Sequence, residues 1–140
     1  MVANILSCLG LVAITVALHS VGLLTLLRGV LRSPALNDPR IWVTTWLLIR
    51  AVWGLLVIHV VEIAVWAGLY WWLGYMPDAE SALYFSGVTY ATIGYGDLLL
   101  PDGWRYLAPI EGLAGILMCG LSTGFFVAML HRIHVARGAS

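Results

Sequence analysis

Residues 89–97 read TYATIGYGD and place Tyr95 between two glycines, with Asp97 at the end of the run. Glycine has no side chain and adopts backbone angles that other residues avoid. A Gly-Tyr-Gly run therefore indicates a backbone arranged to present its own carbonyl oxygens to a partner. The nature of that partner depends on the elements that hold the run and on where they lie.

The composition is that of a membrane protein. Of the 140 residues, 61% are hydrophobic and only 10% are charged, which is too few to cover the surface of a soluble domain. The formal net charge of zero argues against nucleic acid as a partner. Cys8 and Cys119 lie in separate apolar segments without metal-ligand spacing, so we interpret them as buried free thiols. Neither a nucleophile–base pattern nor a phosphate-binding loop is present, so we expect no enzymatic activity and no cofactor.

Three apolar stretches, 3–27, 41–73 and 104–131, are long enough for a bilayer, which requires about 20 residues of helix. No basic stretch precedes the first, so we expect it to remain as a membrane helix and not to be cleaved as a signal peptide. In the second, tryptophans recur at helical spacing around Arg50, which is typical of a helix end at the lipid headgroups. Residues 41–50 therefore either lie in the interface or belong to one strongly tilted helix.

The charges between the apolar stretches predict an orientation. Arginines surround the first connection and follow the third stretch. The acidic residues between the second and third stretches are Asp78, Glu80, Asp97 and Asp102. Because positive residues mark the cytoplasmic side, we expect a multi-pass protein of the cell membrane with its N-terminus outside and its C-terminus inside. The TYATIGYGD run then faces outward.

A helix too short to cross a bilayer is predicted just before this run. Pro77-Asp78 indicates a turn followed by a helix start, with Asp78 as the N-cap. The following residues are apolar or small without strand alternation, which predicts a helix over 79–91 that dips into the membrane and must return. Non-helical backbone at membrane depth is tolerated only inside protein or beside a water-filled cavity, and residues 92–97 would be that backbone.

Closely spaced carbonyl oxygens can replace the hydration shell that a cation loses on leaving water. Four chains around one axis would present stacked rings of such oxygens, and the dipole of the short helix would attract a cation to its inner end. Ile93 and Tyr95 would point away from the ion and pack behind, while the Thr92 hydroxyl would add the innermost ring. The expected ion-binding residues are Thr92, Ile93, Gly94, Tyr95 and Gly96.

The segment TIGYGD is similar to the selectivity filter of potassium channels, in which valine usually stands at the place of Ile93. ALYFSGVTYATIGYGD and WRYLAPIEGLAGILMCGLSTGFF resemble the pore helix, filter and inner helix of small bacterial channels of the two-helix pore-loop family. The likeness covers about Val52–His131. It implies a homotetramer in the lipid bilayer that conducts K⁺ through the filter carbonyls.

The expected fold is an all-α membrane protein with three transmembrane helices, a re-entrant pore helix and an extended filter, assembled as a tetramer. Residues 1–40 would form an N-terminal transmembrane helix and a cytoplasmic loop, to which the resemblance gives no function. Residues 41–140 would form the pore domain. Its expected parts are an outer helix over 41–73, a pore helix over 79–91, a filter over 92–97 and an inner helix over 104–131.

Two positions depart from the family pattern. Ala91 stands where most members carry a second threonine, a change that would loosen packing behind the innermost ion site. Val88 stands where some members carry a glutamate bonded to the aspartate after the filter. Asp97 must then use another donor, and Tyr84 in the short helix is the candidate. We therefore expect Tyr84 and Asp97 to support the filter.

Ionisable residues within the apolar stretches have two interpretations. His59 and Glu62 share a helix face, and His19 from the first stretch can join them. Because histidine titrates near physiological pH, this intramembrane cluster could sense protons. We favour instead a neutral, hydrogen-bonded cluster that holds helices together. Glu111 is expected to bond either to the back of the short helix or to Arg105.

The glycines of the third stretch are likewise ambiguous. In related channels a mid-helix glycine acts as a gating hinge, and Gly115 lies near that place. Small residues also allow membrane helices to approach closely, and Gly120 and Gly124 form such a pair. The two interpretations of Gly115 have equal weight.

Three alternatives to a potassium channel were weighed. A Gly-Tyr-Gly surface turn in a helical bundle would not require the short helix before it. A cation channel that discriminates weakly between K⁺ and Na⁺ is disfavoured by the filter tyrosine. A non-conducting membrane scaffold or accessory subunit with a pore-like fold is not excluded by anything in the sequence.

Overall fold

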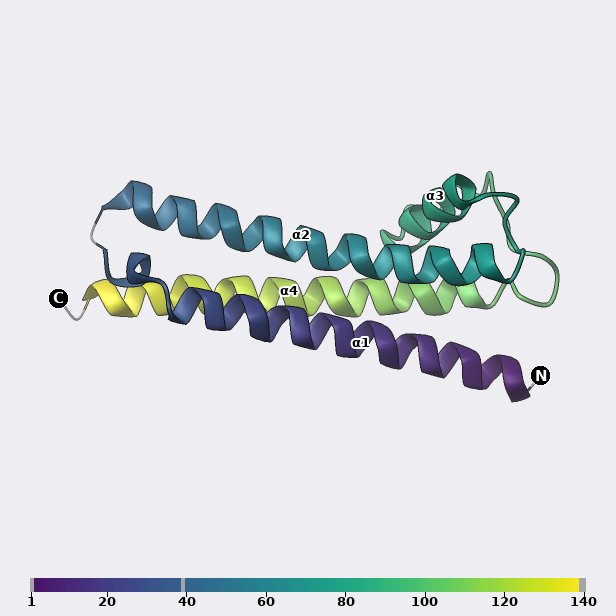
Figure 1. The fold of residues 1–140 in the computed structure, drawn as a ribbon, viewed down its shortest axis with the longest axis horizontal. Coiled ribbons are helices and arrows are strands. Elements are labelled where there is room, and N and C mark those ends of the chain that lie inside the picture. The colour runs from purple at the N-terminus through teal and green to yellow at the C-terminus, as the bar shows by residue number, and fades with distance from the viewer. Residues whose placement is uncertain (1, 39, 139–140) are drawn as a thin grey trace.

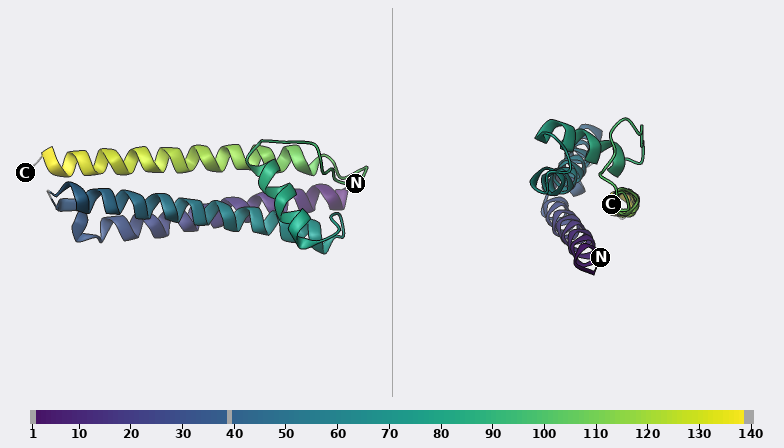
Figure 2. Two further views of the ribbon diagram at one scale, coloured as in Figure 1. Left: turned by 90° about the horizontal axis from the view of Figure 1, so that it is seen from above. Right: turned by 90° about the vertical axis from the view of Figure 1, so that its right-hand side faces the viewer.

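The structure, a computed structural model, describes residues 2–38 and 40–138. The described part contains helices and no strand. Its elements in chain order are α1 (Val2–Leu31), the 3-10 helix η1 (Pro34–Asn37), α2 (Ile41–Trp72), α3 (Ala79–Tyr90) and α4 (Leu107–Gly138). The helices α1, α2 and α4 run alongside one another, and the short α3 lies obliquely across one end of this bundle (Figure 1; Figure 2).

Three helices are long and apolar enough to cross a membrane: Cys8–Leu31, Ile41–Trp72 and Leu107–Val135. The expected all-α membrane fold with three spans and a short additional helix is confirmed. The N-terminus lies at the same end of the bundle as α3, and the C-terminus lies at the opposite end (Figure 1). Three consecutive spans produce this arrangement because each crossing reverses the direction of the chain.

The helix bounds bear on the position of residues 41–50, which the sequence leaves open. Residues 41–50 belong to a single continuous α2, whose 32 residues extend about 48 Å at 1.5 Å per residue. This length exceeds the hydrocarbon core of about 30 Å. The exposed Trp42 and Trp46 lie in its first turns, as expected for side chains at the headgroup level.

Two expectations for the last helix differ from the structure. α4 begins at Leu107, not at residue 104, because Trp104 belongs to a turn in which its N–H donates to the Pro101 carbonyl oxygen at 3.0 Å. At its other end α4 continues past residue 131 to Gly138. Cys8 is buried as expected, whereas Cys119 on α4 is exposed, so the interpretation of both thiols as buried was wrong.

Helices α1 and α2 approach each other closely at two glycines. A Cβ added to Gly22 would lie 2.6 Å from the side chain of Ile58, and one added to Gly54 would lie 2.3 Å from that of Leu26. No hydrophobic force drives helices together in lipid, so membrane helices associate through close packing, which small residues at such positions allow. Buried apolar side chains gather in two clusters, one near α3 around Trp66 and the other near the opposite end around Leu47.

The start of α3 follows the sequence expectation. Asp78 is the N-cap, and its carboxylate accepts a hydrogen bond from the Ser81 N–H at 2.7 Å. This bond holds the pKa of Asp78 below its usual value. The helix ends at Tyr90 and delivers the chain directly to residues 92–97.

Candidate functional site

The segment of residues 92–97, called the filter segment below, has an alternating backbone. Thr92, Gly94 and Gly96 have φ angles of +60°, +58° and +75°, whereas Ile93 and Tyr95 between them have negative φ. A left-handed conformation costs about 1–2 kcal/mol for a residue with a side chain. Its adoption by a β-branched threonine shows that the surrounding structure holds this backbone. Alternation of left-handed and right-handed residues is the backbone pattern that can turn successive carbonyl groups toward one side of a chain.

The amides at the start of the filter segment bond to α3. The N–H groups of Ile93 and Gly94 both donate to the Val88 carbonyl oxygen, at 2.9 and 3.3 Å, and the Thr92 N–H donates to the Thr89 carbonyl oxygen at 2.9 Å. Among the described residues, no backbone hydrogen bond outside the helices is accepted by a carbonyl of residues 92–96. These oxygens remain free for a partner outside the chain.

The far end of the filter segment is also bonded to α3. The Tyr84 hydroxyl donates to an Asp97 carboxylate oxygen at 2.7 Å, and Tyr84 is the donor that the sequence suggested in place of a glutamate at position 88. The hydrogen bond favours the ionised carboxylate, so it holds the pKa of Asp97 below its usual 3.8. The same bond raises the pKa of Tyr84.

Comparison with known proteins was made with this geometry in view. A family model described as an ion channel matches residues 58–132. The chain belongs to this ion channel family. The match takes in α2 from Ile58 onward, all of α3, the filter segment and α4 up to Arg132, and it leaves out α1. Searches of curated proteins and of solved structures found no match.

Removal of the Tyr84 hydroxyl is expected to make this channel more sensitive to acid. The bond stabilises ionised Asp97, so its contribution is present above the unfolded pKa and is lost as pH falls through the lower folded pKa. In Tyr84→Phe the pKa of Asp97 rises toward 3.8, and loss of ion flux should begin at a higher external pH. Flux from liposomes between about pH 3 and pH 6 measures the shift.

Tyr75→Phe is the matched control for this substitution. Tyr75 lies near the same end of the bundle, and its ring packs against Trp104 with 4.9 Å between the ring centroids. Its removal deletes a hydroxyl without touching Asp97. Coincident pH profiles for Tyr84→Phe and Tyr75→Phe would show that the bond to Asp97 does not support the channel.

Behind the filter segment, a buried carboxylate of α4 bonds to two other helices. Glu111 is fully buried, and it accepts a hydrogen bond from the Tyr70 hydroxyl of α2 at 2.7 Å. Its other oxygen lies within hydrogen-bonding distance of the Ser86 hydroxyl of α3. Of the two partners expected for Glu111, the short helix is therefore correct. Arg105 lies outside α4 and pairs with Asp102 at 3.2 Å.

The protonation state of Glu111 determines whether the hydrogen bonds among Glu111, Ser86 and Tyr70 can all form. The Ser86 oxygen also lies 2.9 Å from the Ile63 carbonyl oxygen, so one hydroxyl hydrogen faces two acceptors. A neutral Glu111 acid would donate to Ser86 and leave the Ser86 hydroxyl to donate to Ile63, while Tyr70 donates to Glu111. The polar side chains of this network would then all be paired.

Glu111→Gln is therefore expected to fold and conduct like the wild type, because an amide reproduces one donor and one acceptor. Glu111→Leu leaves the buried Tyr70 hydroxyl without its acceptor, which costs about 1–3 kcal/mol per chain. Thermal unfolding of the purified protein in detergent should therefore shift downward for leucine and remain nearly unchanged for glutamine. Equal shifts for the two variants would show that hydrogen bonding at Glu111 is not what stabilises the helix contacts.

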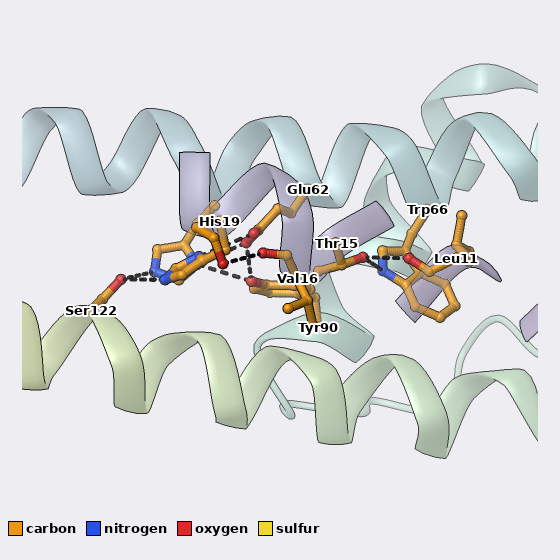
Figure 3. A network of polar contacts seen from close by, with 10 residues as sticks. Leu11, Thr15, Val16, His19, Glu62, Trp66, Tyr90 and Ser122 are labelled. Atoms are coloured by element: carbon orange, nitrogen blue, oxygen red, sulfur yellow. Dashed lines mark hydrogen bonds and ion pairs between the residues drawn. The ribbon is translucent and has the colours of Figure 1, made fainter. Parts of the chain in front are cut away.

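The three residues of the expected intramembrane cluster meet in the structure. His19 Nδ1 lies 3.0 Å from Glu62 Oε1 (Figure 3). His59 Nδ1 lies 3.4 Å from Glu62 Oε2. Two residues not anticipated from the sequence join them. The Tyr90 hydroxyl donates to Glu62 and lies 2.9 Å from His59 Nδ1, while the Ser122 oxygen lies near the Nε2 atoms of both histidines. These five residues are called the histidine cluster below.

The histidine cluster joins all four α-helices of the chain. His19 lies on α1, His59 and Glu62 on α2, Tyr90 at the end of α3 and Ser122 on α4. Contacts across four helices are what the helix-joining interpretation requires, and the choice between that role and proton sensing stays a prediction. Ligand atoms of the two histidines and Glu62 also lie within 4.8 Å of one another, so this is the place in the described chain where a metal ion could be held.

Two glycines of α4 pack against the end of α3. A Cβ on Gly115 would lie 2.1 Å from the Tyr90 carbonyl oxygen, and one on Gly112 would lie 3.3 Å from the Thr89 carbonyl oxygen. Gly115 therefore has a packing role in this structure, while a role as a hinge stays a prediction. An added Cβ on Gly120 or Gly124 would meet nothing within 4 Å, so that pair makes no close contact within one chain.

Proposed function

We propose that this ion channel conducts K⁺ selectively, through rings of backbone carbonyls contributed by residues 92–95 of four copies of the chain. The observation that carries the proposal is the alternating backbone of the filter segment together with its unpaired carbonyls. A dehydrated cation requires such oxygens at close spacing. Thr92, as the innermost residue, offers its hydroxyl in addition to its carbonyl.

The chemistry of these oxygens favours a monovalent cation. Divalent Ca²⁺ and Mg²⁺ are usually held by carboxylates. The carboxylate at the end of the filter segment, Asp97, is bonded to Tyr84. Neutral carbonyls provide a weaker field, which suits K⁺. The C-terminal end of α3 lies just before Thr92 and adds partial negative charge that attracts a cation but not an anion.

An assembly of several copies is supported by side chains that one chain leaves uncovered. Ile93 and Tyr95 are 55% and 69% exposed, so their own chain leaves more than half of each residue uncovered. A groove of about 520 Å³ lies beside the filter segment, between α3 and α4. A neighbouring copy would cover these surfaces. One filter segment cannot encircle an ion, and four around an axis can.

The orientation follows from the charges and the arrangement of the ends. The filter segment and the N-terminus share one end of the bundle (Figure 1), and the arginine-rich connections lie at the other. The positive-inside rule then supports an outward-facing filter and a cytoplasmic C-terminus in the cell membrane.

Flux from liposomes containing the purified protein tests the function. With equal outward gradients of K⁺ or Na⁺, we expect K⁺ to leave at least tenfold faster than Na⁺. Equal rates would replace the proposal with a weakly selective cation channel, and no flux above protein-free liposomes would favour a scaffold or accessory subunit. Native mass in detergent should correspond to four chains. A cross-linking ladder that ends at two would contradict the carbonyl rings.

A further inference from the structure

The histidine cluster does not use the filter carbonyls, and its donor atoms suit a different ion. We propose that His19, His59 and Glu62 form a binding site for a Zn²⁺ ion inside the membrane-spanning bundle. The site would join α1, which lies outside the family match, to the part of the chain that contains the filter segment.

The donor set and its dimensions support zinc. One ligand atom from each of the two histidines and Glu62 lies within 4.8 Å of the others. His19 Nδ1 lies 3.0 Å from Glu62 Oε1, and His59 Nδ1 lies 3.4 Å from the other carboxylate oxygen, Oε2. Ligand atoms at about 2.0–2.1 Å from a tetrahedral zinc lie roughly 3.3 Å apart. Small side-chain rotations are therefore enough to seat the ion. Sites with two histidines and one glutamate are well suited to zinc.

Ser122 orients both imidazole rings for this role. Its oxygen lies 3.0 Å from His59 Nε2 and 3.4 Å from His19 Nε2. A hydroxyl oxygen has two lone pairs and can accept from both Nε2–H groups. In that tautomer both Nδ1 lone pairs point toward Glu62, where they would bind the ion. Histidine ligands of metals usually donate their second N–H in this way.

Burial and charge also favour a cation at this place. His19 and Glu62 are fully buried in helices that span the membrane. In the described part of the chain, the side chains in contact with the Glu62 carboxylate are those of His19, His59 and Tyr90, with no arginine among them. A buried carboxylate requires a positive partner or a complete set of donors. Tyr90 can supply the fourth ligand through its hydroxyl oxygen.

The ligand side chains are covered unevenly within one chain. The His59 side chain is 20% exposed, whereas those of His19 and Glu62 are fully covered. Tyr90 belongs to the same cluster and is two residues from Thr92. An ion bound here would therefore fix α1 and α2 beside the start of the filter segment.

Metal content of the full chain, purified without a histidine tag and stripped with a chelator, tests the site. After equilibration with Zn²⁺ and gel filtration, we expect one zinc per chain, and Co²⁺ should give the strong visible absorption of four-coordinate cobalt. His19→Gln and Glu62→Gln should each lose the bound metal. Ser122→Ala keeps all three ligands but should bind zinc about 10–100-fold more weakly.

The remaining two of the four histidines provide the matched control. His131 and His134 are exposed near the end of α4, and the double variant His131→Gln/His134→Gln should retain one zinc per chain. A wild type without bound zinc, or zinc content unchanged in His19→Gln, would overturn the proposal. If His19→Gln does not fold, as judged by circular dichroism, His59→Gln and the affinity of Ser122→Ala decide. None of these readouts depends on K⁺ flux.

Discussion

Gly115→Ala is expected to abolish ion flux and to reduce assembly of the channel. The added methyl carbon would lie 2.1 Å from the carbonyl oxygen of Tyr90 and 3.0 Å from its carbonyl carbon. Both are backbone atoms and cannot rotate aside as a side chain would. Either α4 must move away from α3 or the end of α3 must shift, and that shift would be carried to Thr92 two residues later. Overpacking of this kind costs about 1–3 kcal/mol or more per chain.

Gly120→Ala is the matched control on the same helix. An added Cβ there would meet nothing within 4 Å of its own chain. In the alanine variant of Gly120 we therefore expect flux and thermal stability close to wild type. K⁺ flux from liposomes and the fraction of assembled protein in gel filtration measure both variants. Wild-type flux in Gly115→Ala would mean that the contact between α4 and Tyr90 is looser than the structure describes.

Local signals along the chain were sufficient to predict the fold. The lengths of the apolar stretches predicted the three spans, and Asp78 marked the start of α3 through its ability to accept from the amide of Ser81. The Tyr84–Asp97 bond was foreseeable because Val88 stands where some members of the resembling family carry a glutamate, so Asp97 required another donor from the short helix. Each of these inferences depends on residues close together in sequence.

Contacts between helices were harder to predict, and the reason is physical. Lipid is as apolar as a protein core, so the lipid-facing and buried sides of a membrane helix carry the same residue types. The exposed Cys119 and the buried Ala114 therefore look alike in the sequence. Likewise, nothing local shows that Ser122, which is 63 residues from His59, would contact it.

The two partners expected for Glu111 could not be separated from the sequence for a related reason. Arg105 is close to Glu111 in sequence, and a helix beginning at 104 would place them on neighbouring turns. α4 begins instead at Leu107, because Trp104 and Arg105 take part in the preceding turn. Arg105 then lies among exposed groups with Asp102, and Glu111 pairs with hydroxyl groups. A three-residue difference at the start of α4 therefore separates the two expected partners.

Gly94→Ala is expected to reduce K⁺ flux at least tenfold while the protein still folds and assembles. Gly94 has a φ of +58°, and an added Cβ would meet no atom within 4 Å, so the substitution acts on the backbone alone. The left-handed conformation costs alanine about 1–2 kcal/mol. Thr92 adopts a similar φ of +60°, which shows that the fold can hold a side-chain-bearing residue in this conformation. Relaxation toward negative φ would turn the carbonyls on either side of residue 94 away from the ion path.

Gly74→Ala separates backbone strain from the loss of ion coordination. Gly74 has a φ of +70° and open space around its Cβ position, yet it lies between α2 and α3, outside the filter segment. Its alanine variant should therefore lose a similar amount of stability, measured by thermal unfolding, and still conduct K⁺. If the two variants conduct equally well, the carbonyls of residues 92–95 do not coordinate the permeant ion. If only Gly94→Ala loses flux at matched stability, the direction of these carbonyls determines conduction, because no side-chain contact differs between the two sites.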